Sequence, residues 1–197
     1  MTEPSQDSVK GNLLYFSPSE QEPSYFTDSL LYICDHGDLG ALGLIVNRPL
    51  NLKLKDLFNS MDITKNSKAE GNVYMGGPVN PGAIFILHSS EKKWDSTMEV
   101  SKDISLSTSE DAIKSIANSE GPKDYLMTLG YSGWGSGQLE GEMERDHWIL
   151  SDIDFKISIW NPSCHILSRF TNESFRNELK SCTDLFLRAL LAGYFSS

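Results

Sequence analysis

The fold is decided by one apolar stretch, Ala41-Leu42-Gly43-Leu44-Ile45-Val46-Asn47, which Arg48 and Pro49 follow. Apolar residues occupy consecutive positions here, so both faces of the strand that they form are expected to be buried. Pro49 cannot donate a hydrogen bond to a neighbouring strand, and it keeps Arg48 in an extended conformation. The sequence therefore predicts a buried strand that ends before Pro49.

Shorter apolar runs on both sides of this strand predict a sheet around it. We expect further strands at Asn12–Phe16, Leu30–Cys34, Asn72–Met75, Ala83–His88, Tyr125–Tyr131 and Phe155–Trp160. Clusters of glycine, proline and small polar residues separate these runs, as is typical of turns and loops.

Helical periodicity appears between the predicted strands. Leu54, Leu57, Phe58 and Met61 recur at helical spacing after Asn51 and predict a short amphipathic helix. A capping-box pattern predicts a second helix, with Ser107 as its N-cap and Glu110 at the third helical position. Further helical segments are expected at Gln138–Asp146 and Asn172–Gly193. The irregular mixture of strands and helices predicts one α+β domain over residues 11–197, after a flexible tail at residues 1–10.

Composition limits the partners that the protein can have. The chain has 197 residues, of which 39% are hydrophobic, so it can form a packed core and is not disordered throughout. Its 17 Lys and Arg residues stand against 27 Asp and Glu residues, a formal net charge of -10. A negative field of this kind repels phosphate backbones, so the composition argues against nucleic acid as a direct partner.

The sequence predicts a soluble protein of the cytoplasm. The first ten residues lack the basic start and apolar run of a secretory signal peptide. The longest apolar stretches are much shorter than the roughly 20 residues that span a bilayer, so no membrane partner is expected. Three widely separated cysteines, Cys34, Cys164 and Cys182, favour a reducing compartment over a disulfide framework.

Four stretches taken together resemble a known family. They are Cys34–His36 leading into Gly40–Pro49, then Gly76–Val79, then Leu87–His88, and finally Leu129–Glu140. Their order and spacing are similar to those of the bacterial AlgH/YqgE family, over roughly residues 11–160.

The resemblance implies a compact α/β domain with a mixed, barrel-like sheet and helices packed around it. It also implies the label of transcriptional regulator, which the family carries through a genetic link to alginate production. No catalytic residue of the family is established that could be carried over to this chain. The resemblance therefore suggests a regulatory binding protein without naming its chemistry.

A glycine-rich segment is the first candidate site. Glycines recur at positions 130, 133, 135 and 137, after a predicted strand and before a predicted acidic helix. Its backbone amides could face an anion, and the candidate ligand-binding residues are Ser132, Trp134, Gly135 and Gly137. Alternatively, the segment is a tight turn that lets Trp134 fold back onto the core. The acids of the following helix disfavour a bound phosphate.

His36, Asn47, Arg48 and His88 form the second candidate site, because each lies near the end of a predicted strand. Together they could bind an anionic metabolite or perform acid–base catalysis. Alternatively, Asp35 pairs with Arg48 to hold a loop, and the histidines bind backbone carbonyls.

No metal site and no cofactor are expected, because the sequence contains neither a CxxC pair nor an HxxxH pair. The first hypothesis is therefore a regulatory binding protein that acts through a protein partner or a small anionic ligand, without direct contact with DNA. The alternative hypothesis is an enzyme or metabolite-binding domain that uses the His36, Asn47, Arg48 and His88 group beside the glycine-rich segment.

Overall fold

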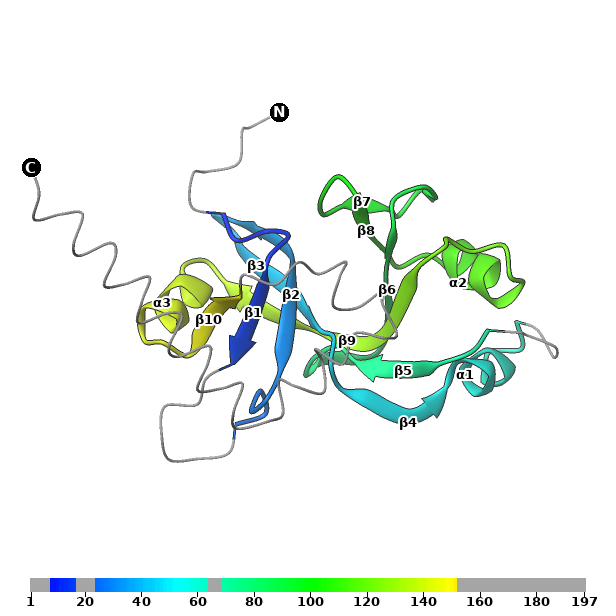
Figure 1. The fold of residues 1–197 in the computed structure, drawn as a ribbon, viewed down its shortest axis with the longest axis horizontal. Coiled ribbons are helices and arrows are strands. Elements are labelled where there is room, and N and C mark those ends of the chain that lie inside the picture. The colour runs from blue at the N-terminus through cyan, green and yellow to red at the C-terminus, as the bar shows by residue number, and fades with distance from the viewer. Residues whose placement is uncertain (1–7, 17–23, 64–68, 152–197) are drawn as a thin grey trace, which may run out of the picture. The chain divides into compact units, whose positions relative to one another are not determined.

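The computed structural model describes residues 8–16, 24–63 and 69–151 (Figure 1). The chain divides into two compact units, residues 1–155 and 156–197, and every described residue lies in the first. The strand expected at Phe155–Trp160 and the helices expected at Asn172–Gly193 therefore lie outside the described residues. Within the range expected to be a flexible tail, Ser8, Val9 and Lys10 each hydrogen-bond to residues of a strand.

Ten strands and three helices make up the described unit. The strands are β1 (Leu13–Phe16), β2 (Leu30–Gly37), β3 (Gly40–Ile45), β4 (Pro49–Lys53), β5 (Asn72–Met75), β6 (Val79–Ser89), β7 (Met98–Glu99), β8 (Ile104–Ser107), β9 (Tyr125–Gly135) and β10 (Trp148–Ser151). The helices are α1 (Leu54–Ser60), α2 (Glu110–Ala117) and α3 (Gln138–Glu144).

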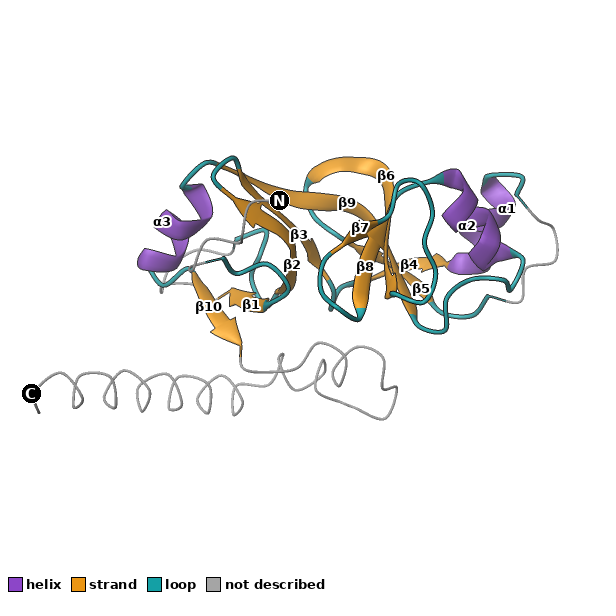
Figure 2. Cartoon of the chain, turned by 90° about the horizontal axis from the view of Figure 1, so that it is seen from above, coloured by secondary structure: helices purple, strands orange, loops and turns teal. Residues whose placement is uncertain are grey.

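All ten strands belong to one curled sheet, in the order β10-β1-β2-β3-β9-β6-β8-β7, with β4 and β5 attached beside β9. The pairing of β5 with β9 is parallel and the others are antiparallel, so the sheet is mixed, as predicted. The described unit combines this sheet with three helices, and the sheet dominates. The helices do not surround this sheet. Figure 2 shows α3 at one end of the sheet and α1 with α2 at the other.

Strand β9 connects the two ends of the sheet, because its two halves pair with different strands. Its first half, around Thr128, pairs with β5 and β6. Its second half pairs with β3, in a register that joins Ser132 to Gly43 and Gly135 to Gly40. The eleven residues of β9 therefore hold both ends of the sheet in one hydrogen-bonded structure.

Each end has its own hydrophobic core. One core gathers the buried side of α1 and α2 around Val73, Ile86 and Met127. The other is formed by Leu14, Leu31, Ile33, Ile45, Trp134, Leu139 and Trp148. Leu54, Leu57 and Phe58 are buried as their spacing predicts, whereas Met61 follows the last turn of α1 and is 38% exposed.

Several elements differ from their sequence-based expectations. Pro49 begins a strand, β4, which is possible because the first residue of a strand at a sheet edge need not donate to a ladder. The short strands β7, β8 and β10 were not predicted, since two to four residues carry little periodic signal. Helix α2 is capped by Ser109, whose side chain accepts from the amide of Ala112, so the prediction of Ser107 as N-cap was wrong.

The backbone of Gly76 and Gly77 packs directly on β9. A Cβ on Gly76 would lie 2.2 Å from the carbonyl oxygen of Gly130, and one on Gly77 would lie 2.2 Å from the carbonyl carbon of Tyr131. Gly130 itself has a φ of 71°, in the left-handed region that favours glycine. Only residues without side chains allow these two segments to approach so closely.

We expect Gly76→Ala to reduce the free energy of unfolding by about 2 kcal/mol or more, because the added methyl group must displace backbone. Urea unfolding followed by circular dichroism measures the change. The matched control is Gly82→Ala, because a Cβ there meets nothing within 4 Å. Equal stability of the two variants would contradict the close-packing argument.

Candidate functional site

The four residues expected to share a rim are not brought together. His36 is paired with Ala41 beside the turn that joins β2 to β3, whereas Asn47 follows the opposite end of β3. Asn47 lies six positions along the extended chain from Ala41, a distance of about 20 Å. His88 lies on β6, beyond β9. Each of these side chains therefore has to be considered in its own surroundings.

His36 links three segments of the chain. Its Nδ1 accepts a hydrogen bond from the backbone amide of Val9 at 3.1 Å, and its Nε2 lies 3.0 Å from Oε1 of Glu140. Because Nδ1 is an acceptor, Nε2 carries the proton and donates it to the carboxylate. His36 thereby fastens the chain before β1 and helix α3 to the end of β2.

Asn47 and Arg48 hold the turn that precedes β2. The Asn47 side chain accepts from the amide of Leu30 at 2.9 Å and donates to the carbonyl of Asp28 at 2.8 Å. The Arg48 guanidinium donates to the carbonyls of Tyr25 and Thr27, and it lies over the Tyr25 ring.

The predicted pairing of Asp35 with Arg48 was wrong. Asp35 pairs instead with Lys10, at 3.3 Å. Asp35 lies near the β2–β3 turn, whereas Arg48 follows the opposite end of β3, so the two side chains cannot meet.

We expect Arg48→Ala to lower the free energy of unfolding by roughly 1–2 kcal/mol, because two carbonyls lose a charged donor. Arg48→Lys should recover only part of this, since a single ammonium lacks the planar fork that reaches both oxygens. Thermal unfolding measures both variants, with the exposed Lys55→Ala as control. An unchanged melting temperature in Arg48→Ala would show that the side chain has no structural role.

The glycine-rich segment is mainly a strand and not the expected loop. Ser132, Trp134 and Gly135 belong to β9, and only Ser136 and Gly137 form the turn before α3. Pairing with β3 occupies this half of the strand, and the Gly135 amide donates to the side chain of Gln138 at 3.1 Å. Trp134 is 7% exposed and packs in the core, as the alternative of an inward-folded Trp134 predicted.

One carboxylate joins the two tryptophans of this end of the sheet. The indole nitrogens of Trp134 and Trp148 both donate to Oε2 of Glu142, each at 2.9 Å, and Gln138 donates to Oε1 at 3.1 Å. Glu142 thus ties α3 to β9 and β10. The sequence did not predict this role, because the acids of the helix indicated only that a bound phosphate is disfavoured.

We expect Glu142→Ala to lower the free energy of unfolding by roughly 2 kcal/mol or more, since two indole N–H groups lose their acceptor. Glu142→Gln keeps one acceptor oxygen and should be milder. Urea unfolding gives the values, and Glu144→Ala, an exposed acid of the same helix, is the control. A similar loss in Glu144→Ala would point to helix charge instead of the indole bonds.

A buried chain of hydrogen bonds surrounds His88. Its Nε2 lies 2.8 Å from Oγ of Ser107, which lies 2.8 Å from Oγ1 of Thr97. Its Nδ1 lies 3.0 Å from the carbonyl oxygen of Ser89. Because a carbonyl can only accept, Nδ1 carries the proton and Nε2 accepts from Ser107. The predicted interaction of a histidine with a backbone carbonyl is therefore present at His88.

Burial dominates the electrostatics of this site. His88 and Ser107 are both 0% exposed. Burial lowers the pKa of His88, while the bond to Ser89 and the carboxylate of Glu91 act in the opposite direction. The imidazole is consequently held in its neutral form.

The Ser107 and His88 pair has the hydrogen-bonding pattern of a nucleophile beside a general base. Complete burial closes this arrangement to substrates, so its chemistry in this form is structural. The sequence contained a signal for it: Ile104-Ser105-Leu106-Ser107 alternates apolar and hydroxyl residues, as a strand beside His88 would.

The next candidates for chemistry are metal-binding side chains and the thiol of Cys34. Across the described residues, no group of three His, Cys, Asp or Glu side chains could hold a metal ion. Cys34 is completely buried, and burial raises the pKa of its thiol. A buried, protonated thiol is chemically inert.

The fold and these sites define an α+β protein built on one curled sheet, and comparisons with known proteins place it in a family. Residues 13–173 match a family described as AlgH-like. The UPF0301 protein of Saccharophagus degradans is 41% identical over 151 residues, 76% of this chain and 74% of that protein. The UPF0301 protein of Thioalkalivibrio sulfidiphilus is 43% identical over 141 residues, 71% and 75% of the two chains. The chain belongs to the AlgH-like family, as its sequence motifs suggested.

Solved structures agree with this assignment. The solution structure of the AlgH protein from Pseudomonas aeruginosa has a TM-score of 0.67 at 31% identity, covering 82% of this chain and 85% of that one. The crystal structure of a Corynebacterium diphtheriae protein has a TM-score of 0.58 at 17% identity, covering 85% and 93%, and shows a shared fold alone. Among the described residues of this chain, no helix is long and apolar enough to cross a membrane.

Proposed function

We propose that this chain is a cytoplasmic regulatory protein that acts by binding another protein and makes no direct contact with DNA. Its place in the AlgH-like family and its net charge of -10 support the proposal. Because this charge disfavours contact with phosphate backbones, we expect the regulator to influence transcription through a partner that carries the contact with nucleic acid.

Many of the described basic side chains already have partners. Lys10, Lys93 and Lys114 form ion pairs with Asp35, Glu99 and Glu110. Arg48 and Lys92 donate to backbone carbonyls, and Lys53 donates to Asn72. A DNA-binding surface needs several free basic groups on one face, and these side chains do not supply it.

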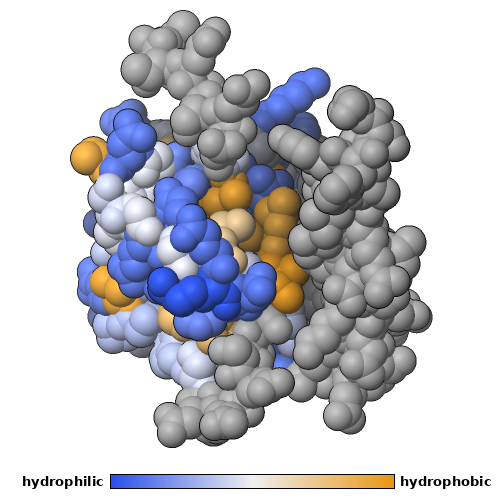
Figure 3. All heavy atoms as spheres, turned by 90° about the vertical axis from the view of Figure 1, so that its left-hand side faces the viewer, coloured by the Kyte–Doolittle hydropathy of each residue, from blue (hydrophilic) through white to orange (hydrophobic). Residues whose placement is uncertain are grey.

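The observation that carries the proposal is the charged end of the sheet beside α3. We call it the acidic end and define it by Asp38, Glu140 and Glu144, all of which are exposed, whereas the neighbouring Asp35 is paired with Lys10. The His36 to Glu140 bond holds α3 against the β2–β3 turn, so these three carboxylates belong to one region. Figure 3 looks at this side of the molecule and shows mainly hydrophilic residues with a smaller hydrophobic area beside them.

An exposed leucine accompanies these carboxylates. Leu39 forms the tip of the β2–β3 turn between Asp38 and Gly40, and it is 96% exposed. A lone apolar side chain framed by acids suits a partner whose basic residues surround an apolar contact. The partner that we propose is therefore a protein with a basic surface.

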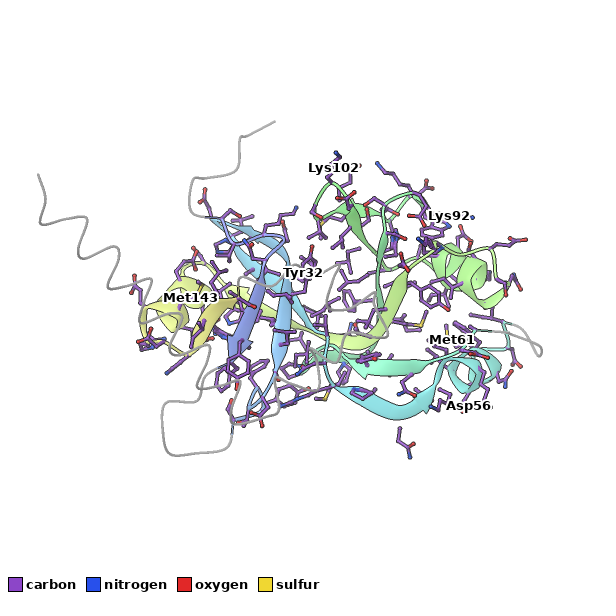
Figure 4. All side chains as sticks on the ribbon, viewed as in Figure 1. Tyr32, Asp56, Met61, Lys92, Lys102 and Met143 are labelled. Atoms are coloured by element: carbon purple, nitrogen blue, oxygen red, sulfur yellow. The ribbon has the colours of Figure 1, made fainter. Side chains whose placement is uncertain are left out.

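Site-specific photo-crosslinking in the protein's own host tests this function. A crosslinking amino acid at position 39 should capture a protein with a basic surface. The double variant Asp38→Lys with Glu144→Lys should lower the yield roughly fivefold or more, because like charges then oppose the partner. The matched control, Asp56→Lys with Glu70→Lys, makes the same change of charge away from the acidic end; Figure 4 labels Asp56 and Met143 at opposite ends of the sheet.

Two results would contradict the proposal. One is an equal crosslinking yield in the two double variants, which would show that the acidic end does not take part. The other is a mobility shift of duplex DNA by the purified protein at low salt, which would show direct contact with DNA.

A further inference from the structure

We propose that His88 and the segment Ser90–Thr97, here called the Trp94 segment, form an acid-sensitive closure that opens and uncovers Trp94 when His88 gains a proton. The closure lies on β6 and β8, on the other side of β9 from the acidic end, and does not rest on the proposed function. Figure 4 labels Lys92 in this segment and Lys102 in the turn between β7 and β8.

The hydrogen bonds that run from Trp94 through Thr97 and Ser107 to His88 each have one direction once Nδ1 of His88 carries the proton. The amide of Trp94 donates to Oγ1 of Thr97 at 2.7 Å. The Ser107 hydroxyl donates to Nε2 of His88, so the Thr97 hydroxyl must donate to Ser107. This series of hydrogen bonds therefore ends on the unprotonated Nε2 of His88, because that nitrogen accepts a hydrogen bond and has no hydrogen to donate in turn.

A proton on Nε2 removes that final acceptor. Ser107 must then accept from the imidazolium, and either its own hydroxyl hydrogen or that of Thr97 has no acceptor left in the chain. An unpaired hydroxyl and an uncompensated charge in a buried site both cost free energy. Moving Thr97 and its segment into water relieves both.

The groups that face His88 do not neutralise a positive charge there fully. From β9 the titratable neighbour is Tyr125, which is paired with His88 across the two strands. Strand β8 contributes Ser105 and Ser107 and carries no titratable group. From the Trp94 segment, Glu91 faces His88, but its carboxylate is exposed and already accepts from Ser89 and from the amide of Lys123.

The remaining charged residues of the segment point to other partners. Lys92 donates to the carbonyl of Glu120, and Lys93 pairs with Glu99. Asp95 is exposed. Glu91 is therefore the group that favours protonation, and burial outweighs it, since the pKa of His88 is lowered overall.

Other hydrogen bonds also hold the segment: the amide of Ser90 donates to the carbonyl of Asp103 at 3.2 Å, and the hydroxyl of Ser96 accepts from the amide of Thr108 at 3.3 Å. The attachment of Thr97 through Ser107 differs from these, because it ends on a histidine that can gain a proton. Ser90 is bonded to Ser105 through their hydroxyl groups at 2.8 Å. Trp94 packs partly buried against the core of α1 and α2, and its ring meets that of His88 edge-on at 5.3 Å. Opening would expose this indole and a margin of that core, which is a surface that a partner can bind only in acid.

The sign of the pH dependence follows from the direction of the shift. A histidine whose pKa is lowered by folding stabilises the closed form fully above its ordinary pKa, about 6.5. That stabilisation is lost as the pH falls below this value toward the lowered pKa. The segment is therefore closed at pH 7.5 and opens progressively below pH 6.5.

Hydrogen exchange measured by mass spectrometry on the full chain tests the closure. Peptides that cover residues 90–97 should lose protection roughly tenfold between pH 7.5 and pH 5, after correction for intrinsic exchange rates. In His88→Gln, whose amide oxygen can accept from Ser107 but does not titrate, the protection should not change with pH. His147→Gln, a histidine near the acidic end, should respond as the original protein does.

A measurement on the unmodified chain keeps the test decisive if His88→Gln fails to fold. The titration of the His88 ring, followed by carbon-13 NMR, should have the same midpoint as the loss of protection. Different midpoints would overturn the proposal. So would protection of the segment that is independent of pH, or a pH response that persists in folded His88→Gln.

Discussion

The rest of the structure depends on the direct contact between the backbone at Gly76–Gly77 and the backbone of β9. A Cβ at either glycine would lie 2.2 Å from a backbone atom of β9, far inside van der Waals contact. At this crossing β9 stops pairing with β5 and β6 and begins to pair with β3. The contact thereby allows one strand to serve two hydrophobic cores.

Polar side chains then fix what packs at each end. At the end beside α3, Glu142 accepts from two buried indoles, and His36 joins α3 to the β2–β3 hairpin. At the other end, His88 closes the hydrogen-bond chain through Ser107 and Thr97. Both arrangements satisfy buried donors and acceptors that would otherwise destabilise the fold. They also explain why the histidines do not share a site.

Much of the fold could be predicted from local patterns. The continuous apolar run of β3 and the helical spacing of Leu54, Leu57 and Phe58 both reflect burial. Burial produces patterns of apolar residues that can be recognised in the sequence. The candidate site was harder to predict. His36 and Arg48 lie twelve positions apart in the sequence, but β3 lies between them and carries the chain to the opposite end of the hairpin. Their closeness in sequence therefore did not become closeness in space. Ser107 fitted a capping box, yet its hydroxyl binds His88 nineteen residues away.

By itself, the sequence determined the α+β class, the family, the central strand and the excess of negative charge. These depend on composition and on contacts between near neighbours. Tertiary structure decided the partners of Arg48, the strand conformation of Ser132–Gly135, and the proton positions on His36 and His88. Those features depend on which strands meet across the sheet, because a hydrogen bond is set by atoms that folding brings together and not by distance along the chain.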